Sequence, residues 1–344
     1  MKKFRVGISP TLTNSDGSQP FPSYDLSALA ADPAFEIETF KASTPLAASD
    51  IENYDALVLL GEIMAADSFA GNGRLAVIGR MGVGYDTVDV PSCTRNNVAL
   101  TITPESARRP MAQAALTLIL ALAGKLMVKD QMTRRGPDGW AERTNHHGLG
   151  LYGRTLGVIG VGNIGKEFLK VVKPFDMRIV GYDPLHSATE AAALGYELMS
   201  TEDVFREADF LSLHCPLNEN TRHLVNVERL NLMKPEAYVI NTARGPVVDQ
   251  NALTEALLAN KIAGAGLDVF DVEPSPADER LNAMDNVILT PHAMGWTDQM
   301  FHEMAVANMA AFRAVADGQN PSHVVNAEVL DKVDFKAKLG GFND

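Results

Sequence analysis

The chain is short of basic residues and of cysteine. Its 30 Lys and Arg face 43 Asp and Glu, giving a formal net charge of −13 at pH 7. Nucleic acids and anionic membrane surfaces bind to basic faces, and no long run of Lys and Arg supplies one, so neither is expected as a partner. The two cysteines, Cys93 and Cys215, lie far apart and outside any C-x-x-C spacing. They indicate neither a disulfide framework nor a metal site, and they fit a reducing cytoplasm.

Long hydrophobic runs are also missing. The only candidate for a membrane span, residues 111–123, contains Gln113 and Thr117 and has the length of a buried helix rather than of a bilayer span. The N-terminus begins with positive charge, but its apolar run before Pro10 is too short for a signal peptide and predicts a first strand. With 46% hydrophobic and 21% charged residues over 344 positions, the chain can bury substantial cores and is long enough for two domains.

A glycine motif is the most informative feature that is present. Residues 155–159 are an apolar run, and Gly160, Gly162 and Gly165 follow it. This order predicts a strand, a glycine turn and a helix, the layout that cradles a dinucleotide pyrophosphate. Gly160 permits the tight turn, Gly162 lets the backbone approach phosphate oxygens, and Gly165 lets the helix pack closely on the strand. The helix directs its first N–H groups and its positive dipole end at the anion.

A second apolar run, residues 177–182, ends in Asp183. A carboxylate at this distance after the glycine turn is placed to meet the ribose hydroxyls of the dinucleotide. Because it would repel a 2′-phosphate, Asp183 favours NAD over NADP.

Apolar runs of strand length recur on both sides of this motif, with helical intervals between them, and indicate two doubly wound α/β domains. A long helix over residues 105–125 is expected to join them, and a helix over residues 297–317 is expected to return the chain to the first. The sequence therefore predicts a Rossmann NAD-binding domain of residues 104–296 inserted into a flavodoxin-like substrate-binding domain of residues 1–103 and 297–344. The polar tail, residues 332–344, is expected to be loosely held.

Three residues directly follow apolar runs of the second half: Arg244, Glu273 and His292. In an open parallel sheet, ligands bind beyond the carboxyl ends of the strands, so these side chains are expected to converge beside the nicotinamide. Each also has an ordinary interpretation, as a helix cap, a surface-loop residue and a turn residue respectively. Their coincidence at three strand ends of one dinucleotide sheet favours catalysis.

The three residue types suit the oxidation of a 2-hydroxy acid. His292 can exchange the hydroxyl proton near neutral pH, and Arg244 can hold a carboxylate or keto group through its planar fork. Glu273 would orient His292 and stabilise its protonated form.

These motifs together resemble the D-isomer-specific 2-hydroxyacid dehydrogenase family. The matching stretches are residues 79–89, the glycine motif with residues 182–184, and residues 213–217, 241–245, 267–274 and 291–292. The resemblance implies that Arg244, Glu273 and His292 are the catalytic trio, that the cofactor is NAD, and that the protein is a homodimer. It also implies that the amides of Gly82, Val83 and Gly84 bind the substrate carboxylate, since consecutive N–H groups form an anion nest. The resemblance also implies which residues contact NAD. They are Gly160, Gly162, Asn163, Ile164, Gly165, Asp183, Cys215, Pro216, Thr242, Ala243, Arg244, Asp268, His292 and Gly295.

Departures from the family pattern concentrate near the expected substrate site. Arg108 and Arg109 are unusual there, and one of them could select a substrate with a second anionic or polar group, although a solvated hinge is an equal alternative. Trp296 is a candidate wall of the substrate pocket, whereas a single aromatic residue is more commonly part of a core or an interface.

Three rivals share this fold. A formate-type dehydrogenase calls for Gln as the partner of the His, so Glu273 counts against it. A phosphite-type dehydrogenase keeps the Arg, Glu and His pattern. A nucleotide-sensing binding module would not need the intact trio.

Overall fold

The computed structural model describes residues 3–14, 16–71 and 73–342. The chain forms two compact units, unit 1 from Met1–Ala107 with Trp296–Asp344, and unit 2 from Arg108–Gly295. The predicted boundaries, at 103/104 and 296/297, lie within a few residues of these. The first boundary falls inside helix α4 (Pro104–Ala123).

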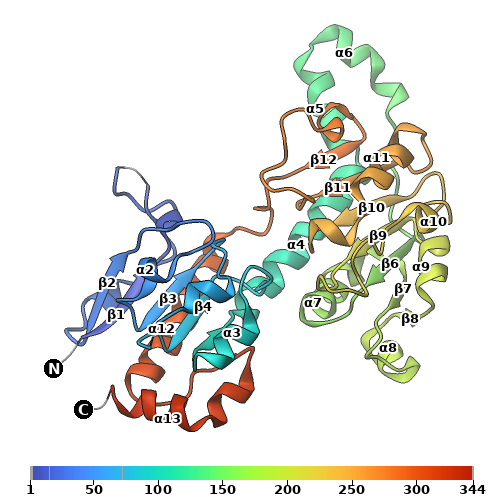
Figure 1. Ribbon diagram of the computed structural model, residues 1–344. Helices are drawn as coiled ribbons and strands as arrows, with labels where there is room; N and C mark the ends of the chain where they lie inside the picture. The colour runs from blue at the N-terminus through green and yellow to red at the C-terminus, as the bar shows by residue number, and fades with distance from the viewer. Residues whose placement is uncertain (1–2, 15, 72, 343–344) are drawn as a thin grey trace. The chain divides into compact units, whose positions relative to one another are not determined.

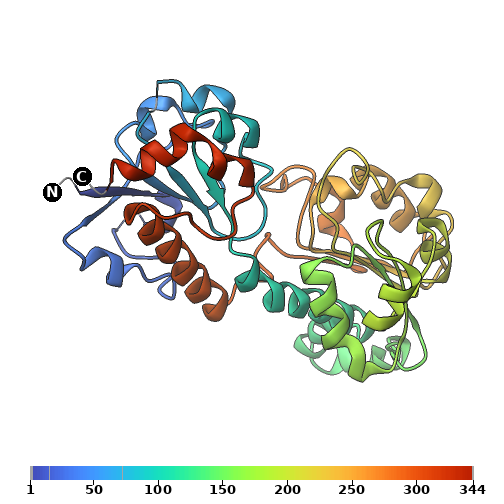
Figure 2. The same cartoon turned by 90° about the horizontal axis from the view of Figure 1, so that it is seen from below.

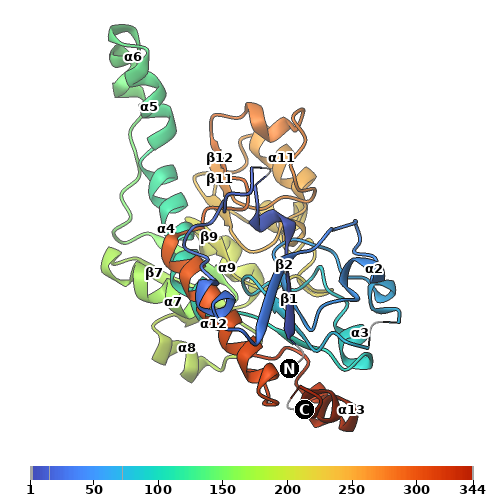
Figure 3. The same ribbon diagram turned by 90° about the vertical axis from the view of Figure 1, so that its left-hand side faces the viewer.

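Unit 1 is built on a parallel sheet of five strands in the order β2-β1-β3-β4-β5. This is the flavodoxin-like order that the sequence predicts. All residues of β3 and β4 are buried, as expected for parallel strands covered on both faces. Figure 3 shows α12 on one side of β1 and β2, and α2 and α3 on the other. The strands are β1 (Phe4–Ile8), β2 (Phe35–Thr39), β3 (Ala56–Leu59), β4 (Val77–Arg80) and β5 (Ala99–Thr101).

Helix α12 (Asp298–Ala316) returns the chain to unit 1 and packs against β4. A Cβ on Gly79 would lie 2.7 Å from Asn308 Oδ1, and one on Gly82 would lie 3.7 Å from the Met304 methyl group, so α12 runs antiparallel to β4. Its first turn therefore extends past the carboxyl end of that strand. The other helices of unit 1 are η1 (Pro10–Leu12), α1 (Ser27–Ala30), α2 (Ala48–Ile51), η2 (Ala66–Phe69), α3 (Val90–Arg95), η7 (Ala327–Asp331) and α13 (Val333–Gly340).

The prediction of a loosely held tail is wrong for most of its length. Residues 333–340 form α13, which buries Phe335 and Leu339, one helical turn apart. The Lys338 ammonium donates to the carbonyls of Leu75 at 2.7 Å and Asn97 at 3.0 Å, which ties α13 to unit 1. The sequence analysis missed this helix because the segment is polar apart from the narrow apolar stripe formed by Phe335 and Leu339. Residues 343–344 lie outside the described part of the chain.

Unit 2 contains a parallel sheet of seven strands in the order β12-β11-β10-β9-β6-β7-β8. The chain moves outward from β6 through β7 and β8, then returns to β9 on the other side of β6 and continues to β12. This reversal between β6 and β9 is the switch point of a Rossmann fold, and the predicted fold class is confirmed. The strands are β6 (Thr155–Ile159), β7 (Arg178–Tyr182), β8 (Glu197–Leu198), β9 (Phe210–Leu213), β10 (Tyr238–Asn241), β11 (Gly264–Leu267) and β12 (Val287–Leu289).

The sheet of unit 2 has a hydrophobic core on each face, because successive strand residues point to opposite sides. Tyr238 and Ile240 of β10 pack with α4 and α7, whereas Val239 packs with α9 and α11. Figure 2 shows these helices on the two sides of the sheet, α4 and α7 in teal and green and the others in yellow to gold. The helices are α7 (Asn163–Val172), η4 (Lys173–Phe175), α8 (Ala188–Leu194), α9 (Thr201–Glu207), α10 (Val227–Leu230), η5 (Gly245–Val247), α11 (Gln250–Leu258) and η6 (Arg280–Ala283).

Two further helices, α5 (Leu126–Arg134) and α6 (Pro137–Ala141), follow α4 and project from unit 2 in Figure 1, with η3 (Glu142–Asn145) after them. Among the described residues, no single helix is long and apolar enough to cross a membrane. The α4 and α5 pair would pass such a test together, but the two helices are bent by 57°.

Candidate active site

The glycine turn lies between β6 and α7 at the switch point of the sheet. Gly160 has φ +87°, which favours glycine, and a Cβ there would lie 2.7 Å from the backbone nitrogen of Cys215. A Cβ on Gly165 would lie 2.4 Å from the carbonyl oxygen of Gly160, so this position needs glycine for α7 to pack on the turn. Around Gly162, by contrast, nothing lies within 4 Å of where a Cβ would be. The backbone at Gly162 is therefore open to a ligand.

This part of the structure fits a dinucleotide. Gly162 is the N-cap of α7 and has no side chain to cap the helix, so the helix begins beside the space where a pyrophosphate would be bound, with Asn163 and Ile164 in its first turn. At the end of β10, the Thr242 hydroxyl is buried and has no hydrogen-bond partner among the described residues. Such an orphaned group is suited to contact a bound molecule. Cys215 and Pro216 follow β9 between these two points.

Asp183 ends β7 beside the glycine turn. Its carboxylate accepts hydrogen bonds from the backbone N–H of Val161 at 2.7 Å and of Leu185 at 2.9 Å, and the residue is 9% exposed. The side chain thus holds a fixed negative charge against the turn, at the position where the sequence analysis expects the ribose.

Arg244 follows β10, where its backbone leads into η5. Its guanidinium donates to the Ala243 carbonyl at 2.7 Å. The next residue, Gly245, has its backbone pressed against the loop after β11, since a Cβ there would lie 1.9 Å from the carbonyl oxygen of Phe270. Gly245 thereby brings the loop of Arg244 directly against the loop that bears Glu273.

Glu273 and His292 form a hydrogen-bonded pair at the ends of β11 and β12. His292 Nδ1 lies 2.7 Å from Glu273 Oε2, and Glu273 Oε1 accepts from the Phe270 N–H at 2.9 Å. Both side chains are partly exposed, that of His292 at 46% and that of Glu273 at 37%, so a substrate can reach them. Because one imidazole nitrogen faces the carboxylate, the other is left to exchange a proton with a ligand.

The charges around Glu273 favour its ionised form. Burial by itself would raise the pKa of Glu273, but the hydrogen bonds from His292 and the Phe270 N–H, with the positive charges of His292 and Arg244, hold it below the ordinary value. Because Gly245 lies against Phe270, Arg244 is held beside the loop that bears Glu273. The three predicted catalytic side chains thus occupy adjacent strand ends.

Asp268 holds the loop that bears His292. Its carboxylate, buried at the end of β11, accepts from the Thr290 hydroxyl at 2.7 Å and from the N–H groups of Ala293 and Met294 at 3.1 Å each. Burial outweighs these bonds and raises the pKa of Asp268. His292 itself has φ +52°, an uncommon conformation for a non-glycine residue that such anchoring can sustain. The expected contact of Asp268 with the nicotinamide amide stays a prediction.

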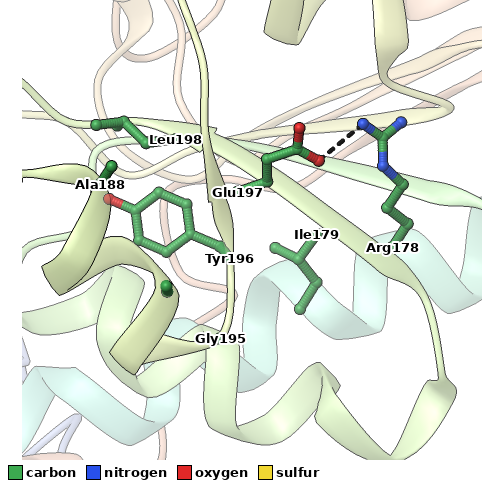
Figure 4. A pocket seen from close by; sticks show the side chains of 8 residues that line it. Arg178, Ile179, Ala188, Gly195, Tyr196, Glu197 and Leu198 are labelled. Carbon is green, nitrogen blue, oxygen red and sulfur yellow. Dashed lines mark hydrogen bonds and ion pairs between the residues drawn. The ribbon is translucent and has the colours of Figure 1, made fainter.

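A pocket of about 650 Å³ opens beside this pair. It is lined by Phe270, Glu273, Pro274, Ser275, Asn282, Leu289, Thr290, Pro291 and His292. A second pocket, of about 500 Å³, lies at the opposite edge of the sheet, around the start of β7 and around β8 (Figure 4). There Arg178 is neutralised by Glu197 at 2.9 Å and Glu207 at 3.0 Å, so this second pocket lacks an uncompensated group for chemistry.

The predicted anion nest, residues 82–84, follows β4 in unit 1. Gly82 has φ +114°, and its N–H donates to the Thr103 hydroxyl at 2.9 Å. That amide is therefore already engaged, which leaves those of Val83 and Gly84 as candidates for a carboxylate. The Arg80 side chain is 8% exposed and stabilises this loop by donating to the Gly84 carbonyl at 2.8 Å.

Arg109, one of the departures noted in the sequence, has a structural explanation. Arg109 pairs with Glu167 of α7 at 3.1 Å, so its charge is compensated within unit 2. Gly295 faces Met111, whose sulfur would lie 2.3 Å from a Cβ at that position. The Met111 side chain thus occupies the space that a side chain at Gly295 would need.

Sequence reasoning missed Gly245 and Thr103 as site residues. Gly245 directly follows the candidate Arg244, and a glycine adjoining a functional residue is a signal for close backbone approach. No pattern in the sequence pairs Thr103 with Gly82.

Comparisons with known proteins show similarity over most of the chain. Residues 116–294 match the family model described as D-isomer specific 2-hydroxyacid dehydrogenase, NAD binding domain. The chain is 37% identical over 307 residues to a glyoxylate reductase of Korarchaeum cryptofilum, covering 86% of this chain and 91% of that protein. It is 38% identical over 304 residues to one of Pyrococcus furiosus, covering 86% and 87%. The holo form of D-mandelate dehydrogenase from Rhodotorula graminis has a similar structure, with TM-score 0.81 and 26% identity over 94% of this chain and 98% of that one.

Proposed function

This chain belongs to the D-isomer-specific 2-hydroxyacid dehydrogenase family. We propose that Arg244, Glu273 and His292 catalyse the interconversion of a D-2-hydroxy acid and its 2-keto acid. The enzyme is NAD-dependent, and its substrate is a small 2-hydroxy or 2-keto acid. The observation that supports the assignment most directly is the Glu273–His292 pair beside Arg244, at the ends of three adjacent strands of the NAD-binding sheet.

His292 is the general acid and base in this proposal. Nδ1 faces Glu273 at 2.7 Å, so Nε2 is the atom that gives a proton to the keto oxygen or takes one from the hydroxyl. Glu273, held ionised by its surroundings, orients the imidazole through this hydrogen bond.

Arg244 anchors the substrate through its carboxylate and keto oxygen. A guanidinium offers parallel N–H donors that match these planar groups. In unit 1, the amides of Val83 and Gly84 are assigned to a substrate carboxylate in this proposal, and NAD supplies the chemistry of hydride transfer when it is bound.

The remaining roles concern the cofactor. Gly160, Gly162, Gly165 and the first amides of α7 receive the pyrophosphate, and Asp183 receives the ribose hydroxyls. The open space at Gly162 and the unpartnered Thr242 hydroxyl support this assignment.

The assignment is tested by following NADH and NADPH oxidation with a panel of 2-keto acids. Turnover of at least one keto acid, with NADH preferred over NADPH, is expected. A complete absence of turnover across the panel would contradict the proposal, and formation of NADH from formate or phosphite would point to the rivals that share this fold.

We propose further that the protein is a cytoplasmic homodimer. Four large apolar side chains on consecutive helices, α4 to α6, are between 41% and 59% exposed, and exposed apolar surface of this kind commonly marks an interface: Leu120, Leu126, Met127 and Trp140. Light scattering on Trp140→Asp is expected to show a monomer, whereas Val333→Asp, an exposed position of unit 1, is expected to leave the dimer intact. A monomeric wild-type protein would overturn this part.

A further inference from the structure

Three aromatic rings form a cluster in unit 1, made of Phe21, Trp296 and Phe301. The rings of Phe21 and Phe301 are stacked with centroids 4.4 Å apart, and Trp296 meets them edge-on at 5.1 Å and 5.7 Å. Phe301 is buried, whereas Trp296 is 42% exposed. The cluster is therefore anchored at its base and presents an indole to its surroundings.

The cluster lies next to the anion nest of residues 82–84. Met304 of α12 contacts the position of Gly82, and Phe301 precedes Met304 by about one turn, roughly 5 Å along the helix axis. Since α12 runs antiparallel to β4, Phe301 and Trp296 lie beyond the carboxyl end of that strand. A small acid whose carboxylate rests on Val83 and Gly84 thus has an aromatic surface within reach of its side chain.

The neighbouring strand end carries a carboxylate and a guanidinium. Glu62 follows β3, which pairs with β4, and its carboxylate accepts hydrogen bonds from the Ser9 hydroxyl and from the Leu60 N–H at 2.9 Å. The Arg80 guanidinium donates to the carbonyls of Leu60 and Gly84, so a positive group joins this loop to the nest. Discrimination against a second carboxylate therefore depends on the aromatic surface, where a charged group would lose its hydration without gaining a partner, whereas an apolar side chain would be stabilised.

We propose that the Phe21–Trp296–Phe301 cluster binds the side chain of the substrate and selects 2-keto acids with a bulky apolar or aromatic side chain over glyoxylate and over dicarboxylic keto acids. This inference rests on the proposed function, since it takes the residue 82–84 nest as the carboxylate site. It separates this chain from the relatives named glyoxylate reductase, whose named substrate has no side chain for such a surface to hold.

The first test compares kcat/KM of the wild-type enzyme, with NADH, on phenylpyruvate, 4-methyl-2-oxopentanoate, glyoxylate and 2-oxoglutarate. The two apolar acids are expected to exceed the other two by at least about tenfold, the discrimination that one methylene-sized difference in an apolar pocket provides. Equal or higher kcat/KM on glyoxylate or 2-oxoglutarate would overturn the inference while leaving the dehydrogenase assignment in place. No turnover of any keto acid would overturn both.

The second test uses Trp296→Ala, with Tyr152→Ala as the control, because Tyr152 is an exposed aromatic residue of unit 2. Trp296→Ala is expected to reduce kcat/KM on phenylpyruvate by at least about tenfold and to leave that on glyoxylate nearly unchanged. Tyr152→Ala is expected to change neither. An equal loss on both acids by folded Trp296→Ala would refute a role in side-chain selection.

If Trp296→Ala is unstable, Phe21→Leu provides the same comparison. This variant keeps an apolar side chain over Phe301 but loses the stacked ring. A selective loss on phenylpyruvate is again expected, and an unselective one would again refute the inference.

Discussion

Replacing Gly245 by Ala tests whether contact between two loops sets the catalytic geometry. The new methyl carbon would lie 1.9 Å from the Phe270 carbonyl oxygen and 2.0 Å from its carbon, whereas ordinary contacts begin near 3.4 Å. The loops must therefore separate by about 1.5 Å at this point. Because the Phe270 N–H holds Glu273 Oε1, such a movement displaces Glu273 from His292.

A misplacement of about 1 Å in a catalytic group commonly costs about 10²-fold in rate. We therefore expect Gly245→Ala to lower kcat by about 10²-fold and to lose about 1–3 kcal/mol of stability from overpacking. NADH affinity should remain near that of the wild type, since the glycine turn lies at β6. The assays are stopped-flow NADH oxidation, NADH fluorescence titration and thermal unfolding.

The matched control is Gly150→Ala, at a position in the same unit where a Cβ meets nothing within 4 Å. It should retain wild-type kcat. Near-normal kcat in a folded Gly245→Ala protein would show that the contact between the loops does not position the Glu273–His292 pair.

Three other perturbations address the assigned roles. His292→Ala should lower kcat by about 10²–10⁴-fold with NADH affinity nearly intact, and near-normal turnover would remove His292 from the mechanism. Because the folded state lowers the pKa of Glu273, its ionised form stabilises the protein above the unfolded pKa, about 4.3, and this contribution is lost as the pH falls through the folded value. The difference in thermal midpoint between wild type and Glu273→Gln should thus be larger at pH 7 than at pH 3, and a difference independent of pH would contradict the assigned ionisation. Asp183→Ala should reduce the NADH-to-NADPH ratio of kcat/KM by about tenfold or more, equivalent to ~1.4 kcal/mol of repulsion, and an unchanged ratio would exclude Asp183 from cofactor choice.

The strands that consist of clear apolar runs were predictable from the sequence. The runs at β1, β6, β7 and β10 are bounded by turn residues, and the glycine spacing after β6 correctly predicted a strand, a turn and a helix. The strands after it follow in order because each crossover in such a sheet has the same hand. The adjacency of Arg244, Glu273 and His292 could be expected for the same reason.

Contacts between segments distant in the sequence could not be predicted. The bond from Gly82 to Thr103 depends on how the loop after β4 meets the start of α4, and the Arg109–Glu167 pair depends on the rotation of α4 against α7. The helix α13 was missed because its polarity matched that of a loose tail. Its docking depends on carbonyls of Leu75 and Asn97, which lie far away in the chain.

Both cysteines of the chain are buried, which affects how the enzyme responds to thiol-directed inhibitors and to oxidants. Burial raises the pKa of Cys215 to about 11 and that of Cys93 to about 12. Since the thiolate is the species that reacts with peroxides and alkylating agents, only about one Cys215 in 10⁴ is reactive at pH 7. Turnover should therefore be unchanged after treatment with diamide or iodoacetamide. A redox enzyme of this kind can continue to work when cellular thiols are being oxidised, and thiol-directed compounds would be poor inhibitors of it.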